Sequence, residues 1–503
     1  MSDQIFLYIA LAIYFAAMLL IGYLAFRRTD DHEDYMLGGR NLPPWVAALS
    51  AGASDMSGWL VMGLPGAIFL TGLIEAWIAV GLTIGAYLNW LLVAPRLRAY
   101  TQVSRNSITV PSFFENRLRD SSRLLRTLSG VVVLVFFTFY ISSGMVAGGV
   151  FFESSFDGDY LVGMLLVGGV TLLYTLFGGF LGASFTDVVQ GLMMVIALIV
   201  VPVSAVIAIG GIDETTSLIA QNAGAEHLSL FGGAMTGATV LAIISSLAWG
   251  LGYFGQPHII VRFMALRSPQ EAKSARRIGI SWMIVSLGGA ILSGLVGIAY
   301  MASQGIDLSN AETVVLVMSQ TLLHPFVAGL ILAAVLAAIM STISSQLIVC
   351  SSALVEDLYK VFRREPPDQK RLVLMGRLAV LVVAVIAIVL AITPNDTILG
   401  LVAFAWAGFG AAFGPIILLS LFWRKLTNWG ALAGMFVGAA TVFIWSALDT
   451  GLYELLPAFV LATIVAVVVS LVTYKHNAEI QQEFTDTGTL LTLPRPHAVG
   501  DTP

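Results

Sequence analysis

The sequence predicts an all-α polytopic membrane protein with thirteen transmembrane helices. Of its 503 residues, 58% are hydrophobic and only 11% are charged, whereas a soluble domain carries about 25% charged residues. Apolar runs of about 20 residues alternate with short polar breaks. This excludes a porin-type barrel, whose strands have about ten residues of alternating polarity. With a single cysteine, Cys350, the chain can form no intrachain disulfide.

Thirteen apolar runs are long enough to cross a bilayer. The ninth is long for one span, so we expect it to tilt or to continue as a cytoplasmic helix through Glu356 and Asp357. The first residues, MSDQIFLY, include no basic region and no cleavage site. The first run is therefore expected to be a span and not a cleaved signal peptide. The expected spans are 5–26, 44–70, 74–94, 127–152, 160–180, 188–210, 236–261, 278–301, 316–350, 374–393, 398–422, 428–447 and 455–474.

The positive charges divide cleanly between the two sides of this topology. All 25 Lys and Arg residues fall in loops after odd-numbered spans or in the tail, whereas the even-numbered loops hold acids such as Glu153, Asp213 and Asp396. The positive-inside rule then places the N-terminus outside and the C-terminus in the cytoplasm. One span missed or invented would scatter the charges over both sides. An error in which a matched pair of spans is merged or split would not be detected by this distribution of charges.

Two of the spans are interrupted. Ser50–Gly66 reads SAGASDMSGWLVMGLPG and Trp249–Arg262 reads WGLGYFGQPHIIVR. Glycine and proline loosen the backbone inside an apolar run, and a carboxylate such as Asp55 costs about 2.5 kcal/mol or more at a helix centre. The two interruptions are five spans apart, so they cross in opposite directions. This predicts two inverted five-helix repeats, spans 2–6 and 7–11, with an ion and substrate site where the broken helices meet.

The sequence is thus expected to fall into five segments. No GxxxxGK[ST] motif occurs, which argues against ATP-driven transport. We expect no enzymatic activity, no nucleic-acid partner and no obligate protein partner. The segments are 1–43 (first span and loop), 44–210 (first repeat), 236–422 (second repeat), 423–474 (two peripheral spans) and 475–503 (a short cytoplasmic helix followed by disorder).

A cluster of hydroxyl groups in the ninth span favours a cation site. The side chains of Ser341 and Thr342, the carbonyl of Ala338, and the carbonyls of Ala53 and Met56 at the first break could supply five oxygens. Small hard cations prefer oxygen ligands, and a site without formal charge suits a monovalent ion that must also leave. The competing interpretation is that each hydroxyl only bonds back to its own helix.

Four further features have both a functional and a purely structural interpretation. Asp55 could attract the cation, or it could be a helix-terminal acid that reaches the surface. Trp249 and Tyr253 are four residues apart on one helix face, which favours a pocket wall over an interfacial belt. Asp187 could gate the cytoplasmic side or complement a helix dipole. Arg40 could be a gate or an interfacial anchor.

These motifs together resemble the sodium/solute symporter family. The resemblance rests on SAGASDMSGWLVMGLPG, WGLGYFGQPHIIVRFMA, LAAIMSTISSQLIVCSSALVEDLY, LGGR at 37–40, FTFYISSG at 137–144 and YTLFGGFLGASFTD at 174–187. It implies a leucine-transporter-type core and one sodium ion bound by Ala53, Met56, Ala338, Ser341 and Thr342, with Asp55 in support. It also implies an L-proline pocket formed by Ser57, Gly58, Trp59, Tyr140, Trp249, Tyr253 and Pro257, to which we add Gln256 and Trp406 as further candidates.

The function expected from this resemblance is sodium-coupled uptake of L-proline by alternating access, in a bacterial inner membrane. Sodium, proline and the lipid bilayer are then the only partners expected. One alternative is a sodium symporter of the same fold that transports another solute, namely another amino acid, a carboxylate or a sugar. A membrane sensor or a channel is the alternative from another class.

Overall fold

The computed structural model describes residues 3–26, 38–359, 369–394, 396–448 and 450–493. These residues are almost entirely helical, and the β-type pairing found in this part of the chain is one isolated bridge between Leu42 and Leu266. Eleven helices of the described part are long and apolar enough to cross a membrane. The all-helical membrane architecture is therefore confirmed, while the exact number of spans stays a prediction.

The helices follow one another along the chain with short connections. Their bounds are α1 Asp3–Phe26, η1 Gly38–Arg40, α3 Pro44–Asp55, η2 Trp59–Gly63, α4 Leu64–Thr71, η3 Leu73–Glu75, α5 Ala76–Leu88, η4 Asn89–Val93, α6 Ala94–Val103, α7 Val110–Leu118, α8 Leu124–Phe156, α9 Tyr160–Ile209, α10 Ile212–Asn222, η5 Ala225–Leu228, α11 Gly237–Ala248, η6 Trp249–Gly255, α12 Pro257–Met264, η7 Pro269–Glu271, α13 Ala272–Gln304, η8 Ala311–Thr313, α14 Val314–Leu322, α15 Pro325–Ser352, η9 Ala353–Tyr359, α16 Gln369–Ala391, α17 Ile398–Phe422, α18 Asn428–Ser446, α19 Leu455–Thr473 and α20 Ala478–Thr492.

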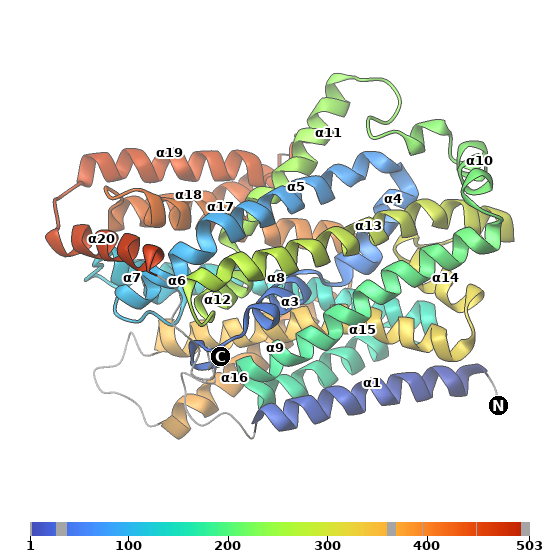
Figure 1. Ribbon diagram of the computed structural model, residues 1–503, viewed down its shortest axis with the longest axis horizontal. Coiled ribbons are helices and arrows are strands. Elements are labelled where there is room, and N and C mark those ends of the chain that lie inside the picture. Colours follow the sequence, from blue (N-terminus) through green and yellow to red (C-terminus); the bar gives the residue numbers. More distant parts are fainter. Residues whose placement is uncertain (1–2, 27–37, 360–368, 395, 449, 494–503) are drawn as a thin grey trace, which may run out of the picture.

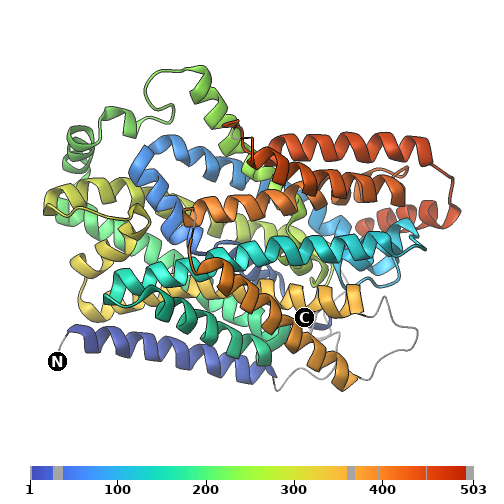
Figure 2. The same ribbon diagram turned by 180° about the vertical axis from the view of Figure 1, so that it is seen from behind.

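The long helices run along the long axis of the molecule (Figure 1). The chain begins at one end of this axis, on the right of Figure 1, which is also the end where α10 lies; we call this end the N-terminal face. Helices α6, α7 and α20 lie at the opposite end, which we call the basic face because the stretch from α6 to the first turn of α8 carries seven arginines between residues 96 and 126. Figure 2 shows the same arrangement from behind, with α1 along one edge.

Both helices that the sequence marks as interrupted are broken in the structure. The first helix ends at Asp55, and Met56 leaves the helical region with φ −83° and ψ 87° before the chain continues as η2 and α4. The second changes into the tighter coil of η6 at Trp249, and Gln256 is extended before Pro257 begins α12. Proline at the first helical position restarts a helix because its missing N–H group needs no partner there.

Helix α9 extends over 50 residues, or about 75 Å if it were straight. Its start follows Phe156, which stacks on Tyr8 of α1. At its other end, Ile209 packs in one cluster with Ile331 in the first turns of α15. Asp187, near the middle, reaches the last turn of α12 on the side of the basic face. Both ends therefore lie toward the N-terminal face, and the chain reverses within α9.

Two local predictions are wrong. The interruption expected between the spans 160–180 and 188–210 is helical, and residues 181–187 belong to α9. The ninth span was expected over 316–350, but residues 314–322 form the separate helix α14, and α15 begins only at Pro325. The cause is His324 followed by Pro325, since the residue before a proline is disfavoured in a helix. The expected continuation through Glu356 and Asp357 is observed as η9.

The tail forms the expected short helix, and this helix is docked on the basic face. Arg119 pairs with Glu479 at 3.0 Å and with Glu483 at 2.7 Å. The Phe484 ring packs edge-on against Tyr100, with ring centroids 6.1 Å apart. Helix α20 thus covers the end of α6. The disorder expected after it concerns residues 494–503, which lie outside the described part.

Close backbone contacts make some glycines irreplaceable. A Cβ atom on Gly85 would lie 2.1 Å from the carbonyl oxygen of Gly250, where α5 crosses η6, whereas a Cβ atom on Gly288 would meet nothing within 4 Å. We expect Gly85→Ala to destabilise the folded protein by about 1–3 kcal/mol, as overpacking does. Thermal unfolding in detergent measures this effect. Gly288→Ala is the control, and equal unfolding midpoints for the two variants would contradict the prediction.

Candidate ion and solute site

Four of the five predicted sodium ligands meet between α3 and α15. The Ser341 hydroxyl donates to the carbonyl of Ala53 at 2.8 Å and to that of Ala338 at 3.1 Å. The Thr342 hydroxyl lies 3.3 Å from the Ala338 carbonyl. These residues are at most 2% exposed. The break explains the free carbonyl, because the N–H of Ser57, which would otherwise bond to Ala53, bonds instead to Asp55.

The remaining members of the ion set lie at the break itself. Met56 is 1% exposed, and its N–H closes the last turn of α3 on Gly52 at 2.9 Å. The Asp55 side chain does not join the oxygen cluster; it accepts a hydrogen bond from the Tyr253 hydroxyl. No group of three or more His, Cys, Asp or Glu residues in the described part could hold a metal ion. The candidate ion site therefore consists of hydroxyl and carbonyl oxygens.

The predicted aromatic residues form a connected cluster around the two breaks. The ring centroids of Trp59 and Trp249 lie 6.3 Å apart. Those of Trp249 and Trp406 lie 6.4 Å apart, and those of Tyr253 and Trp406 lie 5.1 Å apart. The Tyr140 hydroxyl donates to the main-chain carbonyl of Asp55 at 3.2 Å, as does the Trp59 indole N–H at 3.1 Å. The main-chain carbonyl of Asp55, at the end of the broken helix, is thus hydrogen-bonded to two aromatic residues, Tyr140 of α8 and Trp59 of η2.

The other predicted pocket residues have different roles. The Ser57 hydroxyl accepts from the N–H of Trp59 at 3.4 Å. Gly58 lets α8 approach, since a Cβ there would lie 2.9 Å from that of Ala147. The Gln256 amide donates to the carbonyls of Gly252 and Trp406, at 3.2 and 3.1 Å, which ties η6 to α17. Pro257 lies apart from the rings and lines a cavity with Arg262 and Ser345.

Asp187 is part of a fully buried ion pair with Arg262, the two side chains being 0% and 1% exposed. Arg262 Nη2 lies 2.8 Å from the Asp187 carboxylate and 2.8 Å from the Ser345 hydroxyl. Ser50 bridges the pair, donating to Asp187 and accepting from Arg262 Nε, both at 2.7 Å. The cluster joins α3, α9, α12 and α15 between the ion site and the basic face, where a gate would close.

Arg40 lies on the basic face and holds three segments together. Its guanidinium donates to the Ser107 carbonyl at 2.6 Å, to the Thr101 hydroxyl at 3.1 Å and to the Met264 carbonyl at 3.2 Å. Arg40 is half-buried and adopts a positive φ of 52°. It thus connects the entry to α3 with α6 and the end of α12. This position fits an anchor that limits the movement of α3.

The pattern of residue types did not identify several contacts of the site. The pairing of Arg262 with Asp187 could not be read from the sequence. The Asn89 amide donates to the carbonyl of Tyr253 at 2.8 Å and so supports the second break. Tyr453 stacks on Trp249 with centroids 5.4 Å apart. Of these contacts, that of Asn89 had a signal in the sequence, because Asn89 is a lone polar residue within an apolar run.

The chain matches the model of the sodium:solute symporter family over residues 35–438. It is 56% identical over 471 residues to the high-affinity proline transporter PutP of Bacillus subtilis (strain 168), covering 93% of this chain and 98% of the relative. It is 55% identical to the osmoregulated proline transporter OpuE of the same organism, covering 92% and 94%. It is 50% identical to the sodium/proline symporter of Escherichia coli (strain K12), covering 95% of each chain.

Solved structures share the fold. A Na⁺-coupled sialic acid symporter in a substrate-bound outward-open state matches with a TM-score of 0.80 at 19% identity, over 94% of this chain and 99% of that one. The nucleobase-cation-symport-1 family transporter MHP1 matches with a TM-score of 0.52 at 16% identity, over 90% and 97%. At these identities the likeness concerns the fold alone. The family match and the close relatives together show that the chain belongs to the sodium:solute symporter family.

Proposed function

We propose that this protein is a secondary active transporter that takes up L-proline together with sodium. Relatives at 50–56% identity over most of the chain are named as proline transporters or sodium/proline symporters, and none of these names denotes an enzyme. The observation that carries the proposal is the meeting of Ala53, Ala338, Ser341 and Thr342 at the break in α3. This oxygen set suits a weakly held monovalent cation.

In this proposal one broken turn couples the two solutes. Sodium is held by the carbonyls of Ala53, Met56 and Ala338 and by the hydroxyls of Ser341 and Thr342, with Asp55 in support. It joins α3 to α15 and orders the turn that follows. The N–H groups at that turn then favour the proline carboxylate. Positive coupling between the two ligands of about 1–3 kcal/mol is sufficient.

The proline pocket is proposed to lie in the aromatic cluster, where the rings cover the pyrrolidine group. Its members are Ser57, Gly58, Trp59, Tyr140, Trp249, Tyr253, Gln256, Pro257 and Trp406. Asp187, through its pair with Arg262, and Arg40 are proposed to control access from the basic face. Release follows when α3 and α15 separate.

The proposed architecture has thirteen spans, with inverted repeats over 44–210 and 236–422, flanked by 1–43 and by the peripheral spans in 423–474. The reversal within α9 supports two spans in that helix, and the breaks in α3 and η6 support the pairing of the repeats. The distribution of Lys and Arg supports a cytoplasmic basic face and an external N-terminus. The proposed location is a bacterial plasma membrane.

An uptake assay tests the function. We expect membrane vesicles containing this protein to accumulate radiolabelled proline above equilibrium only when the electrochemical gradient of sodium is directed inward. A membrane potential contributes about 2.3 kcal/mol per charge at 100 mV to this gradient. Dissipating the gradient with an ionophore is the control. Equilibration without accumulation would instead indicate a channel. Competition by unlabelled amino acids, carboxylates and sugars decides whether another solute is preferred.

A further inference from the structure

A cavity lies along α15 and η9, on the basic-face side of the candidate ion site. Ser345, one helical turn beyond Ser341, lines it, and so do Ser352 and Asp357 further along the same side of α15 and η9. Pro257 and Thr109 line its other walls. Its walls are mostly apolar, and its polar lining side chains are Thr109, Arg262, Ser345, Ser352 and the carboxylate of Asp357.

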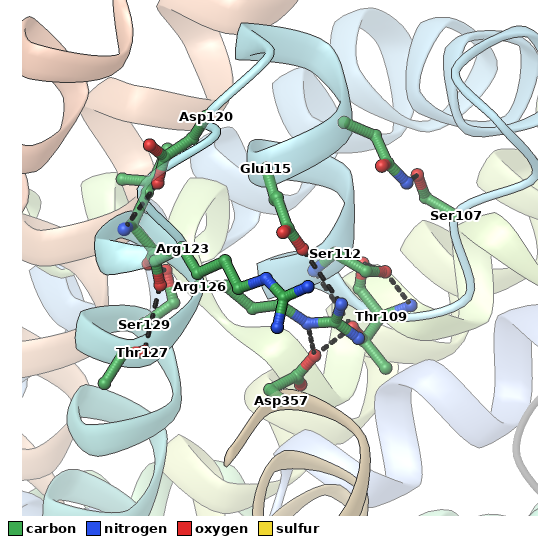
Figure 3. A network of polar contacts seen from close by, with 12 residues as sticks. Ser107, Thr109, Ser112, Glu115, Asp120, Arg123, Arg126, Thr127, Ser129 and Asp357 are labelled. Carbon is green, nitrogen blue, oxygen red and sulfur yellow. Dashed lines mark hydrogen bonds and ion pairs between the residues drawn. The ribbon is translucent and has the colours of Figure 1, made fainter. Parts of the chain in front are cut away.

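The carboxylate of Asp357 is almost completely buried, its side chain being 1% exposed. Its Oδ1 atom accepts hydrogen bonds from Arg126 Nε at 2.9 Å and from the Thr109 hydroxyl at 3.0 Å (Figure 3). Its Oδ2 atom is buried and has no hydrogen-bond partner. A buried carboxylate oxygen without a partner is costly, so this half of Asp357 is available to another ligand.

The cation that neutralises Asp357 has a second partner. Arg126 Nη1 lies 2.9 Å from Glu115 Oε2, and both of these side chains are 18% exposed (Figure 3). Glu115 and Thr109 belong to α7 and its cap, Arg126 to α8, and Asp357 to η9. Arg126 could leave Asp357 and keep a carboxylate partner nearer the solvent. In the described part of the chain Asp357 is paired with Arg126, and without it the carboxylate would need another cation.

We propose that Asp357 is a transient cation site at the cytoplasmic end of the exit path, and that Arg126 is the removable group that occupies it while the path is closed. The inference rests on the proposed sodium-coupled function and adds a second, transient sodium-binding site to it. A sodium ion arriving along α15 replaces the guanidinium as the counter-charge of Asp357. The Thr109 hydroxyl supplies a further oxygen, and Arg126 remains paired with Glu115. The exit path therefore opens when a sodium ion has reached Asp357 and displaced Arg126.

Thiol accessibility tests the role of Arg126 without any measurement of transport. Cys350 is the only cysteine and is 0% exposed, so Cys350→Ser provides a cysteine-free background into which Ser352→Cys places one thiol on the cavity wall. We expect Arg126→Gln to raise the alkylation rate of this thiol by about tenfold, with a membrane-impermeant reagent applied to the basic face. Arg105→Gln, an exposed change on the same face, is the control. Equal rates in the two variants would overturn the proposal.

Two kinds of flux test Asp357 itself. In proteoliposomes, net sodium-driven uptake requires release of the ion inside, whereas proline exchange at saturating sodium on both sides does not. We expect Asp357→Asn to slow net uptake about tenfold more than exchange, and Asp357→Glu to restore part of the loss. A purely structural role would lower both fluxes equally and would refute the cation site. If the unaltered protein shows no sodium-driven proline uptake, the proposed function fails instead, and the thiol assay still decides whether Arg126 closes the cavity.

Discussion

Replacing Ser341 with alanine is expected to raise the sodium concentration for half-maximal proline uptake about tenfold to a hundredfold. Loss of a group that merely supports a metal ligand already has an effect of this size, and Ser341 is proposed to be a ligand itself. The hydroxyl of Ser341 contacts the carbonyls of both Ala53 and Ala338, so its loss removes the oxygen that joins α3 to α15. At saturating sodium, the half-saturation concentration for proline should change little, because the ion-bound form is then restored. Sodium titrations of initial uptake rates measure both quantities.

Ser344→Ala is the matched control for this variant. Ser344 is equally buried and lies on the same helix, but its hydroxyl donates to the Ser341 carbonyl at 3.0 Å and touches none of the other candidate ligands. Thr342→Ala should shift sodium dependence in the same direction as Ser341→Ala. If Ser341→Ala and Thr342→Ala both kept the unaltered sodium dependence, the candidate ion site would be wrong.

The second large effect is expected at the buried pair of Asp187 and Arg262. Asp187→Asn leaves the guanidinium of Arg262 buried without its carboxylate; its hydrogen bonds to Ser50, Ser345 and the His258 carbonyl do not neutralise its charge. Breaking a buried ion pair from one side costs about 3–5 kcal/mol. We therefore expect a large fall in the thermal unfolding midpoint in detergent, together with loss of uptake.

The double variant Asp187→Asn with Arg262→Gln separates stability from function. Removing both charges should recover most of the unfolding midpoint, since neither charge is left unpaired. Uptake should remain impaired if the pair acts as the proposed gate, because the link between α9 and α12 is then gone. Asp213→Asn, at an exposed acid in α10, is the control. Strictly additive losses of stability in the double variant would show that the pair is not coupled and would remove it as a candidate gate.

The parts of the fold that could be predicted from sequence depend on local chemistry. The break after Asp55 was predictable because Gly, Ser and Pro residues interrupt an otherwise apolar run within a few positions. The position of α14 was missed because residues 314–322 are as apolar as a true span. Only the pair His324–Pro325 indicates that the helix ends there. Hydropathy measures whether a segment can enter a membrane, and it does not say where one helix stops and the next begins.

At the candidate site, too, local patterns could be read from the sequence, whereas contacts between distant segments could not. Ser341 and Thr342 were found because neighbouring hydroxyls in an apolar helix form a short pattern. The partner of Asp187 lies 75 residues away and that of Asp357 lies 231 residues away. Such pairs depend on how whole helices pack, and no local pattern of residues encodes them. The close approach of Gly85 to Gly250 is of the same kind.

The docking of α20 has a consequence for biosynthesis. Arg119 is followed by 360 residues before its partner Glu479 is made. At about 5–20 residues per second, translation takes roughly 20–70 s to cover this distance. During that time the surface of α6 that later receives Phe484 is uncovered, and Arg119 has neither of its acidic partners on α20. Helix α20 therefore completes a surface that was made several hundred residues earlier in translation.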